Sequence, residues 1–404
     1  MRNLKILFIF TSLIYTSLSA QVTIGIDEKS VEGSMLQLKN IEKITDGEAN
    51  STKGLLLPRV ELKDMKKLKM GTADEITDSD EKLSHSGLTV YNVHGDPCLL
   101  PIPILKGVHV WDGGEWISFT PLYAPEVSLH KDQDGNEFRA RQFGNAGTWM
   151  IDDLRATKLA DNLGGTPLNN EGTTAGHSTK FAYVYPGLNQ ANLDANISVG
   201  LLYDWNGATN KRPNTRAEAG ELLNEIEKSR HKEGIHHQGI CPQGWHLPTI
   251  AEWIELEKEI IANSGKYSSE TIMSEPNPAL DPNDPLNGEY INKRGKHGYA
   301  MLSPCLPASA SGVNPATGKS VYEGGFALSL SGLVYNGKAG SYGRAAQYAT
   351  NSLAFATTTA SPTQIGGQVT VYITNTENLV TINRRVEARD TDNAGYLPVR
   401  CKKD

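Results

Sequence analysis

The chain has 404 residues and a net charge of −7, and its lysines and arginines are scattered along it without forming a basic stripe. This charge balance argues against nucleic acid or an acidic membrane surface as the partner. The length allows two domains or one large domain, and 39 glycines with 20 prolines favour a turn-rich, strand-rich body.

The first twenty residues have the layout of a secretory signal peptide. Arg2 and Lys5 precede an apolar run, and small residues lead up to Gln21. The run is too short for a membrane-spanning helix, and no later stretch approaches about 20 apolar residues. We therefore expect residues 1–20 to export a soluble chain to the extracellular space or the outer cell surface.

Short strands and turns are predicted after the signal peptide, with a hairpin that turns at Asp112-Gly113-Gly114. The strings VTIG, KGLLLPRV, GLTVYN and VWDGGEW occur in this order. They resemble a module at the N-termini of secreted surface and fibre-like proteins of Bacteroidetes-type bacteria. The resemblance implies a β-rich attachment or display module over residues 21–120, through which the chain can self-assemble. Residues 121–127 read as a linker.

A second hairpin is predicted beyond the linker, and its turn contains Asp132 and Asp134. The string DQDGN also opens like a calcium-binding loop, but an EF-hand needs a glutamate at position 12 and flanking helices. Counting from Asp132, position 12 is Phe143. We therefore expect a turn here and no metal. An exposed helix is predicted further on, over residues 215–232.

The most densely specified stretch is GICPQGWHLPTIAEWIELEKEI, residues 239–260. Thr249 followed three residues later by Glu252 predicts a capping box, so a helix begins after Thr249. Trp253 falls where it can pack against the proline before the cap as a hydrophobic staple. Together with the next two apolar positions, Leu256 and Ile260, Trp253 predicts one buried helix face.

Cys241, Trp245 and His246 precede this helix. The chain has four cysteines, and in an exported protein they are expected to be oxidised, although the sequence alone allows three pairings. An oxidised Cys241 is no nucleophile, and no second carboxylate is placed beside His246. We therefore interpret the stretch as a structural joint and assign no catalytic residue.

Two other motifs resemble a phosphate-binding loop and a zinc site, but the spacing of their residues does not match either kind of site. The string SGVNPATGKS has five residues between its glycines where a phosphate-binding loop needs four. Four histidines lie close together in the chain, but their spacing matches no helix face or knuckle that binds zinc; they are His231, His236, His237 and His246. We expect a plain turn and exposed histidines, and no metal site.

Five strings in order are GNEFRARQFGNAGTWMIDDLRAT, LLYDWNGATN, GICPQGWHLPTIAEWIEL, GGFALSLSGLVYNGKAGSYGRAAQYAT and GYLPVRCKKD. Over residues 128–404 they resemble the Fibrobacter succinogenes major paralogous domain family. The helix start is also similar to that of formylglycine-generating sulfatase modifiers and other proteins of C-type-lectin-like fold. The resemblance implies an α+β, C-type-lectin-like domain with irregular loops and with its two ends close together.

The lectin-like resemblance has two further implications. Such folds bring the C-terminal strand beside the helix start, which implies a Cys241–Cys401 disulfide and leaves Cys98 with Cys305. The tripeptide Glu275-Pro276-Asn277 resembles the calcium ligands of sugar-binding lectins, but the tryptophan-containing motif that those lectins also need does not follow it. Turn formation explains this loop.

A ligand site is implied in the loops before the final strands, which form the recognition face of lectin-like folds. Aromatic rings with amide and guanidinium donors suit sugar hydroxyls and protein epitopes. The candidate residues are Tyr342, Arg344, Tyr348, Asn351, Asn375, Arg384 and Arg385.

These features predict an exported surface protein whose non-enzymatic, lectin-like domain binds an extracellular glycan or protein without a cofactor. The alternative is a structural subunit of a surface fibre or pilus. A glycan-active enzyme is the least favoured reading, because no pair of carboxylates is singled out for acid-base hydrolysis.

Overall fold

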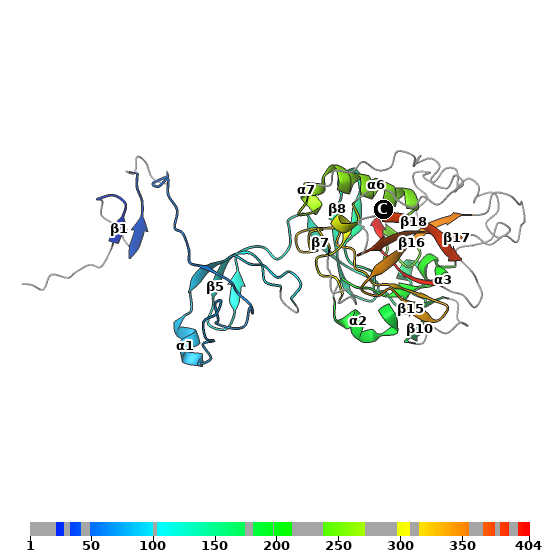
Figure 1. Cartoon of the computed structure of the whole chain (residues 1–404), viewed down its shortest axis with the longest axis horizontal. Helices are drawn as coiled ribbons and strands as arrows, with labels where there is room; N and C mark the ends of the chain where they lie inside the picture. Colours follow the sequence, from blue (N-terminus) through cyan, green and yellow to red (C-terminus); the bar gives the residue numbers. More distant parts are fainter. Residues whose placement is uncertain are drawn as a thin grey trace, which may run out of the picture. The chain divides into compact units, whose positions relative to one another are not determined.

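The structure is a computed structural model of the whole chain (Figure 1). The predicted signal peptide and the predicted helix over residues 215–232 lie outside the residues that it describes. The described residues are 22–27, 33–41, 49–99, 103–173, 181–196, 198–211, 237–270, 297–307, 315–354, 367–375, 380–387 and 395–404.

The chain divides into two compact units. The first comprises Met1–His94 and Lys106–Phe119, and the second comprises Gly95–Leu105 and Thr120–Asp404. The segment Gly95–Leu105 was expected in the N-terminal module but belongs to the second unit instead. The reason is covalent, because Cys98 in this segment is bonded to a cysteine of the second unit.

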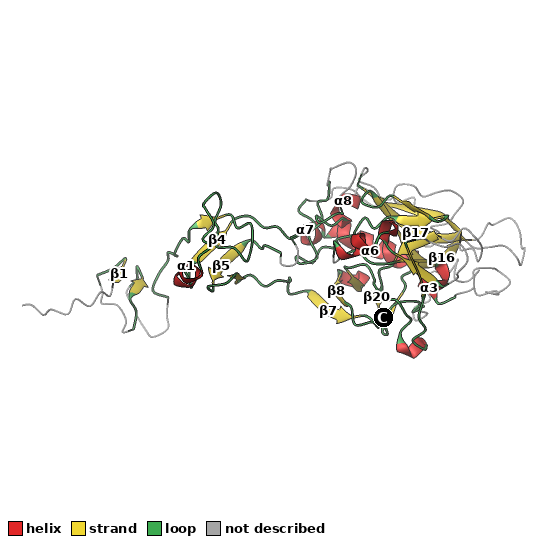
Figure 2. Cartoon of the chain, turned by 90° about the horizontal axis from the view of Figure 1, so that it is seen from below, coloured by secondary structure: helices red, strands yellow, loops and turns green. Residues whose placement is uncertain are grey.

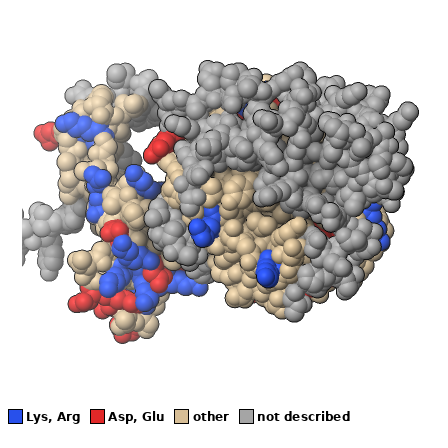
Figure 3. Space-filling model, turned by 45° about the vertical axis from the view of Figure 1, so that its right-hand side comes forward, with Lys and Arg blue, Asp and Glu red and all other residues tan. Residues whose placement is uncertain are grey.

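The first unit contains a parallel strand pair, a four-stranded sheet in the order β3-β4-β5-β6, and a short helix among its described residues (Figure 2). Charges of both signs are interspersed on the face of this unit seen in Figure 3, and Lys63 and Lys67 form ion pairs with Glu61 and Glu75. The elements are β1 (Val22–Ile24), β2 (Leu36–Leu38), β3 (Arg59–Val60), α1 (Ser79–Ser84), β4 (Thr89–Asn92), β5 (Gly107–Trp111) and β6 (Trp116–Ser118).

The hairpin between β5 and β6 confirms the prediction from the sequence. The Asp112 carboxylate accepts hydrogen bonds from the backbone N–H groups of Gly114 and Glu115, each at 2.8 Å, which closes the turn. Trp111 and Trp116 flank the turn and pack edge to face in the core of the unit, with ring centroids 5.5 Å apart.

The described part of the second unit contains three sheets, with strand orders β13-β20-β9-β8-β7, β10-β11-β12-β19-β14-β15 and β16-β17-β18. The first of these sheets holds both β7, which follows the predicted linker, and β20 near the other end of the chain. The strands are β7 (Val127–Lys131), β8 (Glu137–Gln142), β9 (Thr148–Met150), β10 (Asn169–Gly172), β11 (Ala182–Val184), β12 (Leu202–Tyr203), β13 (Trp245–His246), β14 (Leu333–Tyr335), β15 (Lys338–Gly340), β16 (Ala345–Ala354), β17 (Gly367–Thr374), β18 (Val380–Glu387), β19 (Gly395–Pro398) and β20 (Lys402–Lys403).

The main helix of this unit, α6 (Ile250–Ala262), has the predicted amphipathic pattern. Trp253, Leu256 and Ile260 are buried, whereas Glu255 and Lys258 are exposed. The buried face packs against β16 and β17. The other helices are η1 (Gly144–Ala146), η2 (Asp161–Leu163), η3 (Pro186–Leu188), α2 (Gln190–Asp194), α3 (Trp205–Thr209), α7 (Ser264–Tyr267) and α8 (Gly298–Met301). None of the helices in the described ranges is long and apolar enough to cross a membrane.

Candidate functional site

Both implied disulfides are present. Cys241–Cys401 joins the turn before α6 to the residue before β20, with a Cα–Cα distance of 5.8 Å. Cys98–Cys305 joins Gly95–Leu105 to the loop after α8, with a Cα–Cα distance of 5.1 Å. In the chain-entropy model, closing loops of this length stabilises the folded state by up to about 5 kcal/mol per bridge.

The helix start after Cys241 is a capping box, as predicted. The Thr249 hydroxyl accepts from the N–H of Glu252, and the Glu252 carboxylate accepts from the N–H of Thr249 at 2.8 Å. His246 was expected to be exposed and to have no second carboxylate beside it, and both expectations are wrong. It is buried between two carboxylates, with Nε2 2.9 Å from Glu252 Oε1 and Nδ1 2.7 Å from Asp404 Oδ1. Because an ionised carboxylate only accepts hydrogen bonds, both ring nitrogens donate and the imidazole is charged.

The charges in this cluster shift each other's pKa values. Burial works to lower the pKa of His246, but its bonds and charge interactions with Glu252 and Asp404 outweigh burial and raise that pKa. Burial works to raise the pKa of Glu252, but His246, Lys402 and the Thr249 N–H outweigh it and lower that pKa. The cluster therefore holds β13 and α6 to β20 as an ionic joint.

The two tryptophans of the stretch pack in the core of the unit. Trp245 is 4% exposed and meets the rings of His130 and Phe138 edge to face. Trp253 is fully buried and packs against Trp149. The interpretation of this stretch as a structural joint is therefore supported residue by residue.

Three of the predicted ligand residues are buried, which corrects their assignment to an exposed loop. Tyr348 is fully buried on β16, where its hydroxyl lies 2.8 Å from the Ser329 carbonyl and 3.2 Å from Asp153 Oδ1 and shares its one hydrogen between these acceptors. Asn351, also on β16, and Asn375, after β17, are 7% and 5% exposed. None of the three lines the pocket described below.

The other four candidates are distributed differently. Arg344 is exposed just before β16, and Tyr342 is half-buried in the wall of a pocket. Arg384 and Arg385 lie on β18 rather than on the expected loop, and their side chains lie outside the described residues.

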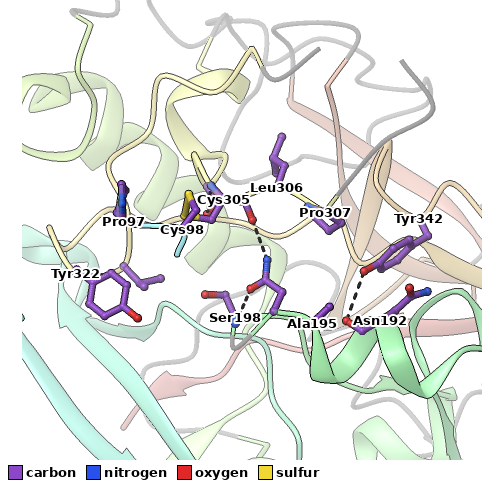
Figure 4. Close-up of a pocket in the computed structure, with 13 residues that line it drawn as sticks. Pro97, Cys98, Asn192, Ala195, Ser198, Cys305, Leu306, Pro307, Tyr322 and Tyr342 are labelled. Atoms are coloured by element: carbon purple, nitrogen blue, oxygen red, sulfur yellow. Dashed lines mark hydrogen bonds between the residues drawn. A yellow bond between two sulfur atoms is a disulfide. The ribbon is translucent and has the colours of Figure 1, made fainter. Parts of the chain in front are cut away.

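The pocket that contains Tyr342 has a volume of about 330 Å³. Figure 4 shows the Cys98–Cys305 disulfide in its wall, with Tyr322 and Tyr342 on opposite sides. Its polar lining residues are Asn192, Asn196, Ser198, Ser303, Tyr322 and Tyr342, and its apolar lining residues are Pro97, Ala195, Leu306, Pro307 and Val321.

Internal hydrogen bonds fix the wall of the pocket. Asn196 Nδ2 donates to the Cys305 carbonyl at 2.8 Å, so the segment after α2 is tied to the disulfide. Arg155 donates to the carbonyls of Leu193, Asn196 and Val199 and holds the same segment from behind. The wall is therefore built before any ligand arrives.

Sequence reasoning missed most of this pocket. Its residues come from five separate parts of the chain, which only the fold and the disulfide bring together. The available signals were Cys98, whose bridge crosses the linker, and Tyr342.

The sequence motifs that resemble calcium-binding and phosphate-binding loops have structural roles in the described part of the chain. The Asp132 carboxylate accepts from the backbone N–H groups of Asp134 and Asn136, each at 2.9 Å, as a hairpin turn requires. Lys319 donates to the Gly265 and Lys266 carbonyls of α7.

The remaining motifs are only partly covered. His237 bonds to the Thr209 carbonyl, whereas His231, His236 and the tripeptide at residues 275–277 lie outside the described residues. Within the described ranges, no group of three or more His, Cys, Asp or Glu side chains is arranged to hold a metal ion.

Two family comparisons match the chain, and together they cover most of it. Residues 23–134 match a phage tail-like trimerisation region. Neither the curated proteins nor the solved structures contain a match to the chain. Residues 144–403, which include α6, both ends of the Cys241–Cys401 bridge and most of the pocket wall, match the Fibrobacter succinogenes major domain, and the chain belongs to that family.

Proposed function

We propose that the protein is an exported surface protein that self-assembles through its N-terminal region and carries its C-terminal domain as a non-enzymatic recognition domain. One observation carries the assembly. Every large apolar side chain that is exposed among the described residues lies between Val22 and Leu129. Residues 23–134 are the part of the chain that matches a trimerisation region. Single exposed apolar residues are common on soluble proteins, but a face on which several of them lie together marks an interaction surface.

The strands β1 and β2 show the concentration most clearly. They pair parallel and in register, with Val22 opposite Leu36 and Ile24 opposite Leu38. Because side chains alternate along a strand, these four share one face of the pair. All four are exposed, with exposed fractions from 36% to 55%. A sheet of two short strands is marginal alone, so this face needs a partner, and further copies of the chain supply it.

The C-terminal domain is proposed to have a C-type-lectin-like fold. Three features support this. The α6 helix begins at a capping box, β7 and β20 lie in one sheet, and a disulfide ties the helix start to the C-terminal strand. The two disulfides also fit an oxidising, extracellular location.

Recognition rather than catalysis is proposed because the conspicuous polar clusters are internal joints. His246 is buried between its carboxylates, and Asp153 is fully enclosed by Arg400, Ser329 and Ser331. The pocket beside Cys98–Cys305, in contrast, opens to solvent and has a preformed wall, as binding sites do.

The test is a panel of glycans and host glycoproteins, presented to the full-length mature protein together with fractionation of the producing cells. The proposal predicts protein at the cell surface and selective binding to members of the panel. Binding to no member, by a protein that is folded and assembled, would contradict the recognition role.

A structural fibre subunit is the second candidate, and the trimerisation match favours it specifically. A fibre subunit polymerises beyond a closed trimer as its concentration rises, whereas a displayed recognition protein stops at a closed assembly. Light scattering over a concentration series separates the two. Turnover of a polysaccharide would instead establish an enzyme.

A further inference from the structure

The pocket beside the Cys98–Cys305 disulfide has an uncharged wall. None of its thirteen lining residues is Asp, Glu, Lys, Arg or His. Two arginines that do not line the pocket contact its wall residues. Arg139 reaches Ser198 Oγ at 3.4 Å and is paired with Asp152, and Arg155 donates to backbone carbonyls, including that of Asn196 at 2.7 Å. A charged ligand would therefore enter without a counter-charge in the described wall, and burying an unpaired charge is costly.

The polar groups of the wall keep hydrogen-bonding capacity of both kinds. Asn192 Nδ2 donates to the Pro186 carbonyl, and no described donor bonds to its Oδ1, which remains an acceptor. The Ser198 and Ser303 hydroxyls accept from Arg139 and from the Cys305 N–H, so their hydrogens remain to donate. Each sugar hydroxyl both donates and accepts, so a mixed set of this kind suits it.

Tyr342 adds an aromatic surface to this wall. Its hydroxyl donates to the Asn192 carbonyl at 3.4 Å, which fixes the ring on one side of the pocket (Figure 4). Gly187 lies beneath it with φ of 63°, and a Cβ there would come within 3.4 Å of the ring and 2.7 Å of Asn192 Nδ2. Glycine therefore allows Tyr342 and Asn192 to come together.

We propose that this pocket binds a neutral sugar unit of an extracellular glycan, with the apolar face of the ring on Tyr342 and its hydroxyls on Asn192, Ser198 and Ser303. The inference rests on the proposed recognition function and names its ligand class. A recessed volume of about 330 Å³ suits a small unit such as one sugar ring. A protein epitope needs a contact surface of roughly 800 Å² on each partner.

The experiment is saturation-transfer NMR on the full-length protein, with methyl glucopyranoside, methyl galactopyranoside and methyl N-acetylglucosaminide as neutral probes. Methyl glucuronide serves as the charged counterpart. At least one neutral probe binds, and its affinity is insensitive to salt because no charge is involved. Tyr342→Ala weakens that binding by about tenfold or more, as loss of a central aromatic contact does. Tyr342→Phe, which keeps the ring, costs only about two- to fivefold.

Tyr335→Ala is the matched control, because Tyr335 is also half-buried in this unit but does not line the pocket. It leaves binding unchanged. The inference is overturned if no neutral probe binds, if methyl glucuronide binds more tightly than the neutral probes, or if Tyr342→Ala binds as well as Tyr335→Ala. Any of these results shows that the pocket is not the sugar-binding site. The proposed recognition function is still supported if the panel of glycans and glycoproteins yields a ligand.

Discussion

Arg400 is fully buried and connects three of the sequence motifs that mark the family. Its Nε donates to Asp153 Oδ1 at 2.8 Å, and its two terminal nitrogens donate to the carbonyls of Phe326 and Ala327. The other Asp153 oxygen accepts from Ser329 and Ser331. Each charged group is therefore satisfied, which is the condition under which a buried ion pair is tolerated.

Replacing Arg400 with methionine leaves Asp153 buried without its cation. We expect the free energy of unfolding to fall by about 3–5 kcal/mol, the usual cost of breaking a buried pair from one side. Chemical denaturation measures the loss. The double variant Arg400→Met/Asp153→Leu is the control and should recover much of the stability, because it removes both charges. A single variant as stable as the wild type would show that the pair is not formed.

The His246–Glu252 pair predicts a stability plateau in pH. The pKa of His246 is raised from its ordinary 6.5, so its contribution is complete below about that pH and is lost as pH rises through the raised value. The pKa of Glu252 is lowered from its ordinary 4.5, so its contribution is complete above that pH and is lost as pH falls through the lowered value. Stability from the pair is therefore greatest between about pH 4.5 and 6.5. The free energy of unfolding, measured across pH, should show this plateau in the wild type and not in His246→Gln. An identical pH profile in the two proteins would refute the assignment.

At the scale of elements, the sequence predicts a structure where local chemistry determines it. The start of α6 was predictable because the hydroxyl and carboxylate of the capping box lie three residues apart in the chain. The hairpin at Asp112 was predictable for the same reason. Both predictions depend on short-range hydrogen bonds that residue types specify.

Thr249→Ala tests the cap directly. We expect the second unit to lose about 1 kcal/mol of stability, because an N-cap hydroxyl is removed. The melting midpoint should fall, and Thr249→Ser, which keeps the hydroxyl, should stay close to the wild type. If both variants melt with the wild type, Thr249 does not cap the helix.

The strands β16 and β18 mark where local reasoning fails. Their residues are rich in Ala, Thr, Asn and Arg and were read as exposed loops. On β16, however, neighbouring positions Tyr348, Ala349 and Thr350 are all buried, so the strand is covered on both faces and shows no alternation. Whether a polar strand is covered depends on what packs against it, and local sequence does not contain that information.

At the scale of the whole molecule, the pocket also could not be predicted from the sequence. Its wall needs the Gly95–Leu105 segment to leave the first unit and join the second through Cys98–Cys305. The resemblance to lectin-like folds supplied the Cys241–Cys401 pairing and left this one by subtraction. The family resemblance itself was confirmed over residues 144–403.

Assembly is also a property of the whole molecule, and the apolar face of β1 and β2 is where it can be disrupted. Ile24→Asp/Leu38→Asp places two charges on that face, and buried unpaired charges oppose association. We expect the variant to be a monomer with an unchanged second unit. Lys258→Asp is the control, because Lys258 is exposed on α6 of the second unit and lies outside the residues that match the trimerisation region. It should assemble as the wild type does.

The most direct test of the account is the mass of the full-length mature protein in solution, measured by light scattering or native mass spectrometry. We expect three times the mass of a single chain for the wild type and for Lys258→Asp, and the mass of one chain for Ile24→Asp/Leu38→Asp. A wild-type protein with the mass of a single chain at every concentration would contradict it.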